Sequence, residues 1–261
     1  MTVPFGVTLL ALGFFGAFVS GLLGVGGAVV MIPLLLYVPP LLDVGRLDVK
    51  AVAGVTMTLV LVAAASGMLA HRRHGGVNAE LARVGGLAMA GGSLAGALAS
   101  KLVDDRALLA VFALMVTAAA FLVFVGAGRD AAAVNPAQVR FSRRRAALVA
   151  GGVGVAAGLV GAGGAFLLVP LLLVVVGVPI RVTIGTSLAI TALAASAGFV
   201  GKLVTLQIPL LPTLAVVLGA IPGAQLGAAV SRRVPPLGLR VALFVCVVVI
   251  ALKVWSDLLS R

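Results

Sequence analysis

A glycine-rich phrase occurs twice in this chain, 137 residues apart, and each copy lies inside a long apolar run. The first copy begins at Gly21 and reads GLLGVGGA, and the second begins at Gly158 and reads GLVGAGGA. A proline follows each phrase at the same distance, Pro33 and Pro170. Two such breaks at corresponding positions of two halves are typical of a transporter built from internal repeats, with the breaks forming its binding site.

The amino-acid composition indicates the broad class of protein. Hydrophobic residues make up 62% of the chain and charged residues 10%, and the mean hydropathy is +1.28. A soluble domain of 261 residues cannot bury so much apolar surface, so an integral membrane protein is expected. The net charge of +12 comes from short basic clusters between apolar runs, with few aromatic residues among them. This pattern indicates membrane topology signals and not nucleic-acid binding.

Eight apolar runs divide into four per half and predict an all-α polytopic membrane protein. They fall at about residues 4–38, 49–70, 81–100, 107–127, 146–178, 182–201, 210–230 and 237–254. The halves also correspond beyond the glycine phrase, since Gly54-Val55-Thr56-Met57 matches Gly185-Thr186-Ser187-Leu188 at an offset of 131. We therefore expect an N-terminal repeat over 1–127, a basic linker over 128–145 and a C-terminal repeat over 146–261.

The two glycine-containing runs are too long for one upright crossing. The second has roughly 15 residues before its glycines and roughly 14 after, or about 21 Å each, against a hydrocarbon core of about 30 Å. Such a run is either a strongly tilted broken helix or a re-entrant hairpin that enters and leaves on one side.

The distribution of basic residues favours the re-entrant hairpin. If all eight runs cross, the 19 Lys and Arg residues split 11 to 8 between the two sides. With re-entrant hairpins they split 12 to 7, which fits the positive-inside rule better. Three crossings per half then invert the second repeat relative to the first, with both termini outside and the linker in the cytoplasm. Eight full crossings remain the alternative. In the re-entrant topology the less basic side carries Arg46, Lys50, Lys101, Arg106, Lys202, Lys253 and Arg261.

These motifs resemble the sulfite exporter TauE/SafE family over essentially the whole chain. The resemblance rests on the duplicated Gly-x-x-Gly-x-Gly-Gly with its proline, on Gly185-Thr186-Ser187-Leu188, and on Pro222-Gly223-Ala224-Gln225-Leu226-Gly227. It implies transport of sulfur-containing anions, such as sulfite or organosulfonates, across the cytoplasmic membrane. It does not specify the anion, the direction or the coupling ion.

The glycine phrase suits an anion for reasons independent of the family. A backbone that stops being helical at membrane depth needs partners for its N–H and C=O groups. Glycine allows positive φ and close approach, and the helix that follows directs free N–H groups and a positive dipole end at the break. A carboxylate or another small inorganic anion is the alternative cargo. The candidate ligand residues in the two breaks are Gly24, Gly26, Gly27, Ala28, Gly161, Gly163, Gly164 and Ala165.

A second group of glycines is spaced for helix packing. Gly92 and Gly96, and their counterparts Gly223 and Gly227, are four residues apart, which is typical of closely packed helices. We expect no ligand role for these four.

Polar side chains in the apolar runs add a few candidates. Thr56, Thr186 and Ser187 lie early in the helices after the breaks, where hydroxyls can donate to an anion. The competing interpretation is that each hydroxyl bonds a carbonyl one turn back in its own helix; we weight Thr58 and Thr191 toward it. Gln225 is the one amide inside a predicted spanning segment, and it suits either a cavity or an interhelical hydrogen bond.

Charges and metal ligands are scarce within the runs. No Asp or Glu lies well inside one, so the sequence offers neither a carboxylate proton relay nor the base or metal ligands of an enzyme. We expect no catalysis, cofactor or metal, and we expect the partners to be the bilayer and a small anion. Lys101 and Lys202 lie at run ends, where snorkelling to the interface is expected.

Overall fold

The computed structural model describes residues 2–23, 28–72, 77–125, 139, 141–231 and 236–260. Every regular element in these ranges is helical. The first half contains α1 (Val3–Leu23), α2 (Ala28–Leu41), α3 (Val49–Arg72), α4 (Ala79–Ala99) and α5 (Asp105–Val125). The second half contains α6 (Arg143–Val160), α7 (Ala165–Leu171), the π-helical turn η3 (Leu172–Val176), α8 (Ile180–Val204), α9 (Leu210–Ser231) and α10 (Pro236–Ser260).

The predicted apolar runs coincide with these helices. In the second half the glycine-containing run is divided at its glycine phrase, since α6 ends at Val160 and α7 begins at Ala165. The glycines of the first phrase, residues 24–27, lie outside the described residues. Most of the predicted linker lies outside the described residues, but Arg143 to Arg145 form the first turn of α6. The all-α architecture expected from the sequence is therefore confirmed.

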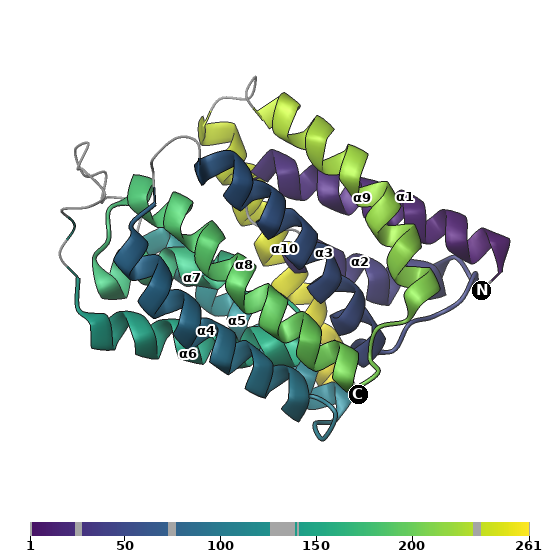
Figure 1. The fold of residues 1–261 in the computed structure, drawn as a ribbon. Coiled ribbons are helices and arrows are strands. Elements are labelled where there is room, and N and C mark those ends of the chain that lie inside the picture. Colours follow the sequence, from purple (N-terminus) through teal and green to yellow (C-terminus); the bar gives the residue numbers. More distant parts are fainter. Residues whose placement is uncertain are drawn as a thin grey trace.

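Helices of the two halves pack against each other and not only within their own half. In Figure 1, α1 and α9 lie side by side, and α4 lies beside α6 and α8. Glycines at these crossings leave no room for a side chain. A Cβ at Gly96 would meet the backbone of Val155 on α6, and one at Gly227 would meet the backbone of Phe18 on α1. Gly92 and Gly223 make equivalent contacts, so the packing role predicted for all four glycines is confirmed.

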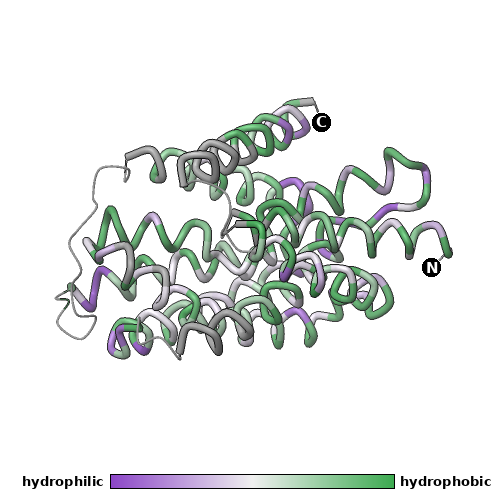
Figure 2. The backbone as a smooth tube through the Cα atoms, turned by 90° about the horizontal axis from the view of Figure 1, so that it is seen from above, coloured by the Kyte–Doolittle hydropathy of each residue, from purple (hydrophilic) through white to green (hydrophobic). Residues whose placement is uncertain are grey.

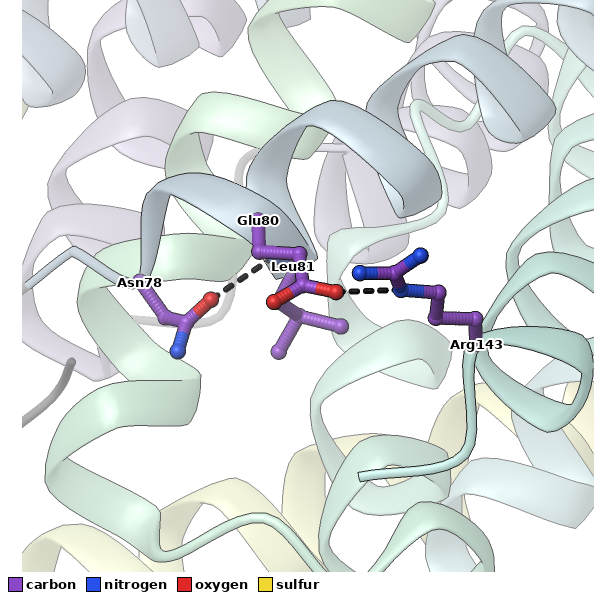
Figure 3. Close-up of polar contacts among 4 residues, drawn as sticks. All are labelled: Asn78, Glu80, Leu81 and Arg143. Carbon is purple, nitrogen blue, oxygen red and sulfur yellow. Dashed lines mark hydrogen bonds and ion pairs between the residues drawn. The ribbon is translucent and has the colours of Figure 1, made fainter. Parts of the chain in front are cut away.

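Both α4 and α6 begin at the same end of the molecule, and polar groups hold these ends together (Figure 3). Asn78 caps α4, because its side chain accepts a 2.8 Å hydrogen bond from the backbone N–H of Leu81. Glu80 forms an ion pair with Arg143 in the first turn of α6. The arginines that begin α6 thus lie at the same level as the start of α4.

The outer surface of the bundle is apolar. Within the residues that the structure describes, four helices are long and hydrophobic enough to cross a membrane, over 79–99, 105–122, 185–204 and 210–227. Large hydrophobic side chains on these helices face outward, for example Leu87, Phe121 and Leu218. Hydrophobic residues also run along most of the described backbone (Figure 2). This exterior meets an apolar solvent when the protein is embedded in a membrane, which is the environment that it fits.

Candidate functional site

The glycine phrase of the second half forms a tight turn, which we call the glycine turn (residues 161–164). Gly161, Gly163 and Gly164 have φ of 76°, 64° and 70°. These left-handed conformations are costly for residues with a Cβ, which explains the requirement for glycine. Gly161 ends α6 and Gly164 begins α7. The predicted interruption of the helix at these glycines is confirmed.

Beyond the turn the chain folds back along α6. A Cβ at Gly164 would meet Val153 and Ala157 of α6, and both α7 and η3 contact that helix. Consequently α6 and α7 form a hairpin instead of one long tilted helix. This geometry is the one that a re-entrant segment requires.

Helices of the first half enclose the glycine turn. Gly161 lies against the backbone of Ala53, and Gly163 lies against the side chain of Val60 near the middle of α3. Gly164 lies against Met89 near the middle of α4. The turn is therefore buried between α3 and α4, with Gly161 near the start of α3 and with Gly163 and Gly164 near the middle of these two helices.

Several backbone N–H groups at the turn lack an acceptor among the described residues. Gly164 provides no side-chain cap for α7. The N–H groups of Gly163, Gly164, Ala165 and Phe166 donate to no group in the described part of the chain. Buried N–H groups are almost always paired in proteins, and unpaired ones at a helix start suit an anionic ligand.

Hydroxyl groups on α3 and α8 differ in whether they have a hydrogen-bond partner. Thr56 donates to Val52 O at 2.8 Å within its own helix, and Thr58 donates to Gly54 O at 3.0 Å. For these two, local bonding one turn back is what the structure shows. Thr191 is different, because its hydroxyl is buried and has no partner in the described part of the molecule. The expectation of local bonding at Thr191 was wrong.

A second unpaired hydroxyl belongs to Ser93 on α4, which the sequence pattern did not single out. Its side chain is 1% exposed and its Oγ has no partner among the described residues. A Cβ at Gly198 would lie 2.5 Å from this Oγ and 2.6 Å from Met57 Cε. Since Met57 lies on α3 between Ala53 and Val60, Ser93 belongs to the layer that surrounds the glycine turn. Its one sequence signal is a lone hydroxyl within a small-residue helix.

The remaining predicted ligand residues lie elsewhere or outside the described residues. Gly24, Gly26 and Gly27 lie outside the described residues, whereas Ala28 is buried at the start of α2. Thr186 is buried and accepts a 3.0 Å hydrogen bond from the backbone N–H of Asn78, at the start of α4. Ser187 is buried beside it on α8. Gln225 is exposed on α9. The structure thus gathers Gly161, Gly163, Gly164, Ala165 and the Thr56 segment of α3, but does not bring Thr186 or Gln225 to the glycine turn.

Lys202 corrects another expectation. Its side chain is fully buried, so it does not snorkel to the interface, whereas Lys101 is exposed as expected. The ammonium group finds three acceptors inside the protein, which removes the need to reach water. Among the described residues, no group of three or more His, Cys, Asp or Glu side chains could hold a metal ion.

The fold and the glycine turn together define a multi-pass helical membrane protein in which a helix is interrupted at a buried turn. A family model described as Sulfite exporter TauE/SafE matches residues 9–254, and the chain belongs to this family.

Curated relatives agree on the class. A probable membrane transporter protein from Bacillus subtilis, YunE, is 26% identical over 242 residues, which cover 87% of this chain and 89% of that protein. A probable membrane transporter protein from Xylella fastidiosa is 28% identical over 239 residues, covering 89% of this chain and 87% of its own length. No solved structure matches this chain. The protein is a membrane transporter of the TauE/SafE family.

Proposed function

We propose that this protein carries small sulfur-containing anions, such as sulfite or an organosulfonate, across the cytoplasmic membrane. The observation that carries the proposal is the set of unpaired N–H groups at the glycine turn, buried between α3 and α4. A sulfur oxyanion supplies several acceptor oxygens to such donors without needing a fixed countercharge. We propose outward transport, and both this direction and the sulfur chemistry of the anion are taken from the family name.

The proposed membrane arrangement is an inverted pair of repeats, each with one re-entrant hairpin and three crossings. It is supported by the α6–α7 hairpin and by the exchange of partners between halves, in which α4 lies along α6 as α9 lies along α1. The positive-inside rule places the linker and the arginines that begin α6 in the cytoplasm. Alternating access then comes from motion of one half against the other around the two glycine breaks.

The ligand set in this proposal combines backbone and hydroxyl donors. From the second half come Gly161, Gly163, Gly164 and Ala165, and the symmetric set is Gly24, Gly26, Gly27 and Ala28. Thr56, Thr186, Ser187 and Gln225 remain proposed contributors, each reached at some stage of the transport cycle. Neutral donors suit a carrier because a fixed charge in direct contact with the anion would hold it too tightly for release.

The test is flux in proteoliposomes with a panel of anions: sulfite, thiosulfate, sulfate, sulfoacetate, taurine and acetate. We expect saturable movement of at least one sulfur anion, and loss of that movement in Gly163→Leu, whose side chain would strike Val60. Gly152→Leu is the matched control, because a Cβ at this position on α6 meets nothing within 4 Å.

Three other results of the flux experiment would change the proposal. Movement of acetate alone would replace the sulfur assignment with a carboxylate. Uptake from outside without release from loaded vesicles would make the protein an importer. Equal flux in wild type and Gly163→Leu would remove the glycine turn from the transport path.

A further inference from the structure

Lys202 is the most heavily bonded buried side chain near the glycine turn. Its Nζ donates to Ser100 Oγ at 2.8 Å, to Gln207 Oε1 at 2.8 Å and to the backbone carbonyl of Leu159 at 3.0 Å. These acceptors come from the end of α4, the turn after α8 and the last turn of α6. One ammonium group therefore joins three elements, and one of the three belongs to the other half.

The bond to Leu159 places a positive charge at the end of the broken helix. The last carbonyls of a helix have no intrahelical partner and carry the negative end of its dipole. Leu159 lies two residues before Gly161, where the glycine turn begins. Lys202 thus satisfies an orphan carbonyl of α6 and offsets partial negative charge directly beside the turn.

Lys202 has no acidic partner among the described residues. The ion pairs between described residues are Arg143 with Glu80 and Lys253 with Asp257, and neither includes Lys202. A buried cation without a carboxylate is expensive unless its donors are all used. Here all three are used, on neutral acceptors that hold it in one place.

We infer that Lys202 is the positioning residue of the anion site, an inference that rests on the proposed function for its effect on transport. It fixes the end of α6 against α4 and the turn after α8. It also neutralises the α6 terminus, so that an anion at the glycine turn meets the N–H groups of α7 without repulsion from the carbonyls of α6.

The first readout needs no transported anion. In Lys202→Met, amide hydrogen exchange in nanodiscs should rise about tenfold over residues 159–165 and stay unchanged in α5. Lys101→Met is the matched control, since this exposed lysine adjoins Ser100 at the end of α4. Unchanged exchange at 159–165 would overturn the inference, and so would a uniform rise across all helices.

The second readout is sulfite flux. Lys202→Met should raise KM for sulfite by about tenfold with a smaller change in the maximal rate, because repulsion from the α6 terminus weakens anion binding. Lys202→Arg, which keeps the charge and the donors, should recover part of the loss. If wild type moves none of the anions while the local exchange effect is present, the proposed function fails and the positioning role stands.

A milder variant covers the case in which Lys202→Met does not fold. Gln207→Leu removes one acceptor of the ammonium group and leaves its bonds to Ser100 and Leu159. We expect exchange at 159–165 to rise about threefold in this variant. Exchange equal to wild type would show that the end of α6 does not depend on this cluster.

Discussion

Gly96 on α4 packs directly against the backbone carbonyl of Val155 on α6. The repeat offsets of 131 and 137 convert this pair into Gly227 and Phe18, and these two residues make the same contact between α9 and α1. Two contacts at equivalent positions, each between different halves, indicate that the repeats exchange partners in a symmetric way. Small residues allow this closeness because helix association in a membrane depends on van der Waals packing.

Gly96→Ala should therefore destabilise the protein by about 1–3 kcal/mol, since even one methyl group would overlap the carbonyl of Val155. Gly227→Ala should cost a similar amount, because its contact is equivalent. Thermal unfolding in one detergent measures both. Gly91→Ala is the control, because it also replaces a glycine of α4 and its Cβ meets nothing within 4 Å. Equal melting temperatures for the Gly91 and Gly96 variants would refute close packing at this crossing.

The ends of α4 and α8 lie together, since Lys202 of α8 bonds to Ser100 just past α4. Leu102 and Leu206, which follow these two helices, are 89% and 90% exposed. The sequence has one cysteine, Cys246. With it replaced by alanine, cysteines at 102 and 206 should both react with an impermeant maleimide from outside. A cysteine at Ala132 in the linker should react only from the cytoplasm. Eight full crossings would instead place positions 102 and 206 on opposite sides.

Sequence reasoning predicted the helices well because their boundaries follow from hydropathy and from glycine and proline. It also predicted the helix break at Gly161 to Gly164, since consecutive glycines weaken a helix and this apolar run is too long for one upright crossing. It could not predict the satisfaction of individual polar groups. Burial of Lys202 depends on three acceptors distant in sequence or beyond its own helix, and the unpaired hydroxyl of Ser93 depends on Gly198 and Met57 from other helices. Such features arise from tertiary packing, which periodicity does not encode.

The cost of a side chain in the glycine turn can be separated from the cost of its backbone conformation. Gly163 and Gly177 both have positive φ, at 64° and 80°, but only Gly163 has a close neighbour, Val60. Alanine should cost about 1–2 kcal/mol at either position from strain alone. Gly163→Ala should in addition abolish sulfite flux, and Gly177→Ala should retain most of it. Comparable loss of flux in both variants would attribute the defect to backbone strain and not to the site.

Thr186 has a structural role that its variants should expose. Its Oγ1 accepts the backbone N–H of Asn78, which begins α4. Thr186→Val removes this acceptor and leaves a buried donor without it, so it should lower stability by about 1–3 kcal/mol. Thr186→Ser keeps the oxygen and should lose much less. A valine variant as stable as wild type would mean that the N–H of Asn78 finds another acceptor at no cost.

The unpaired hydroxyls of Ser93 and Thr191 lead to the most discriminating prediction. A buried hydroxyl without a partner costs stability, so Ser93→Ala and Thr191→Val should melt at or above the wild-type temperature, with a gain of about 1 kcal/mol at most. If these hydroxyls donate to the anion during transport, the same variants should weaken sulfite binding by about three- to tenfold, the value of one neutral hydrogen bond. Thr58→Val is the control, because its hydroxyl already bonds Gly54 O, and it should leave sulfite binding unchanged. Stability and affinity then change in opposite directions at Ser93 and Thr191, which is the behaviour of groups kept for a ligand and not for folding. Sulfite affinity equal to wild type in both variants would leave the two hydroxyls outside the anion path.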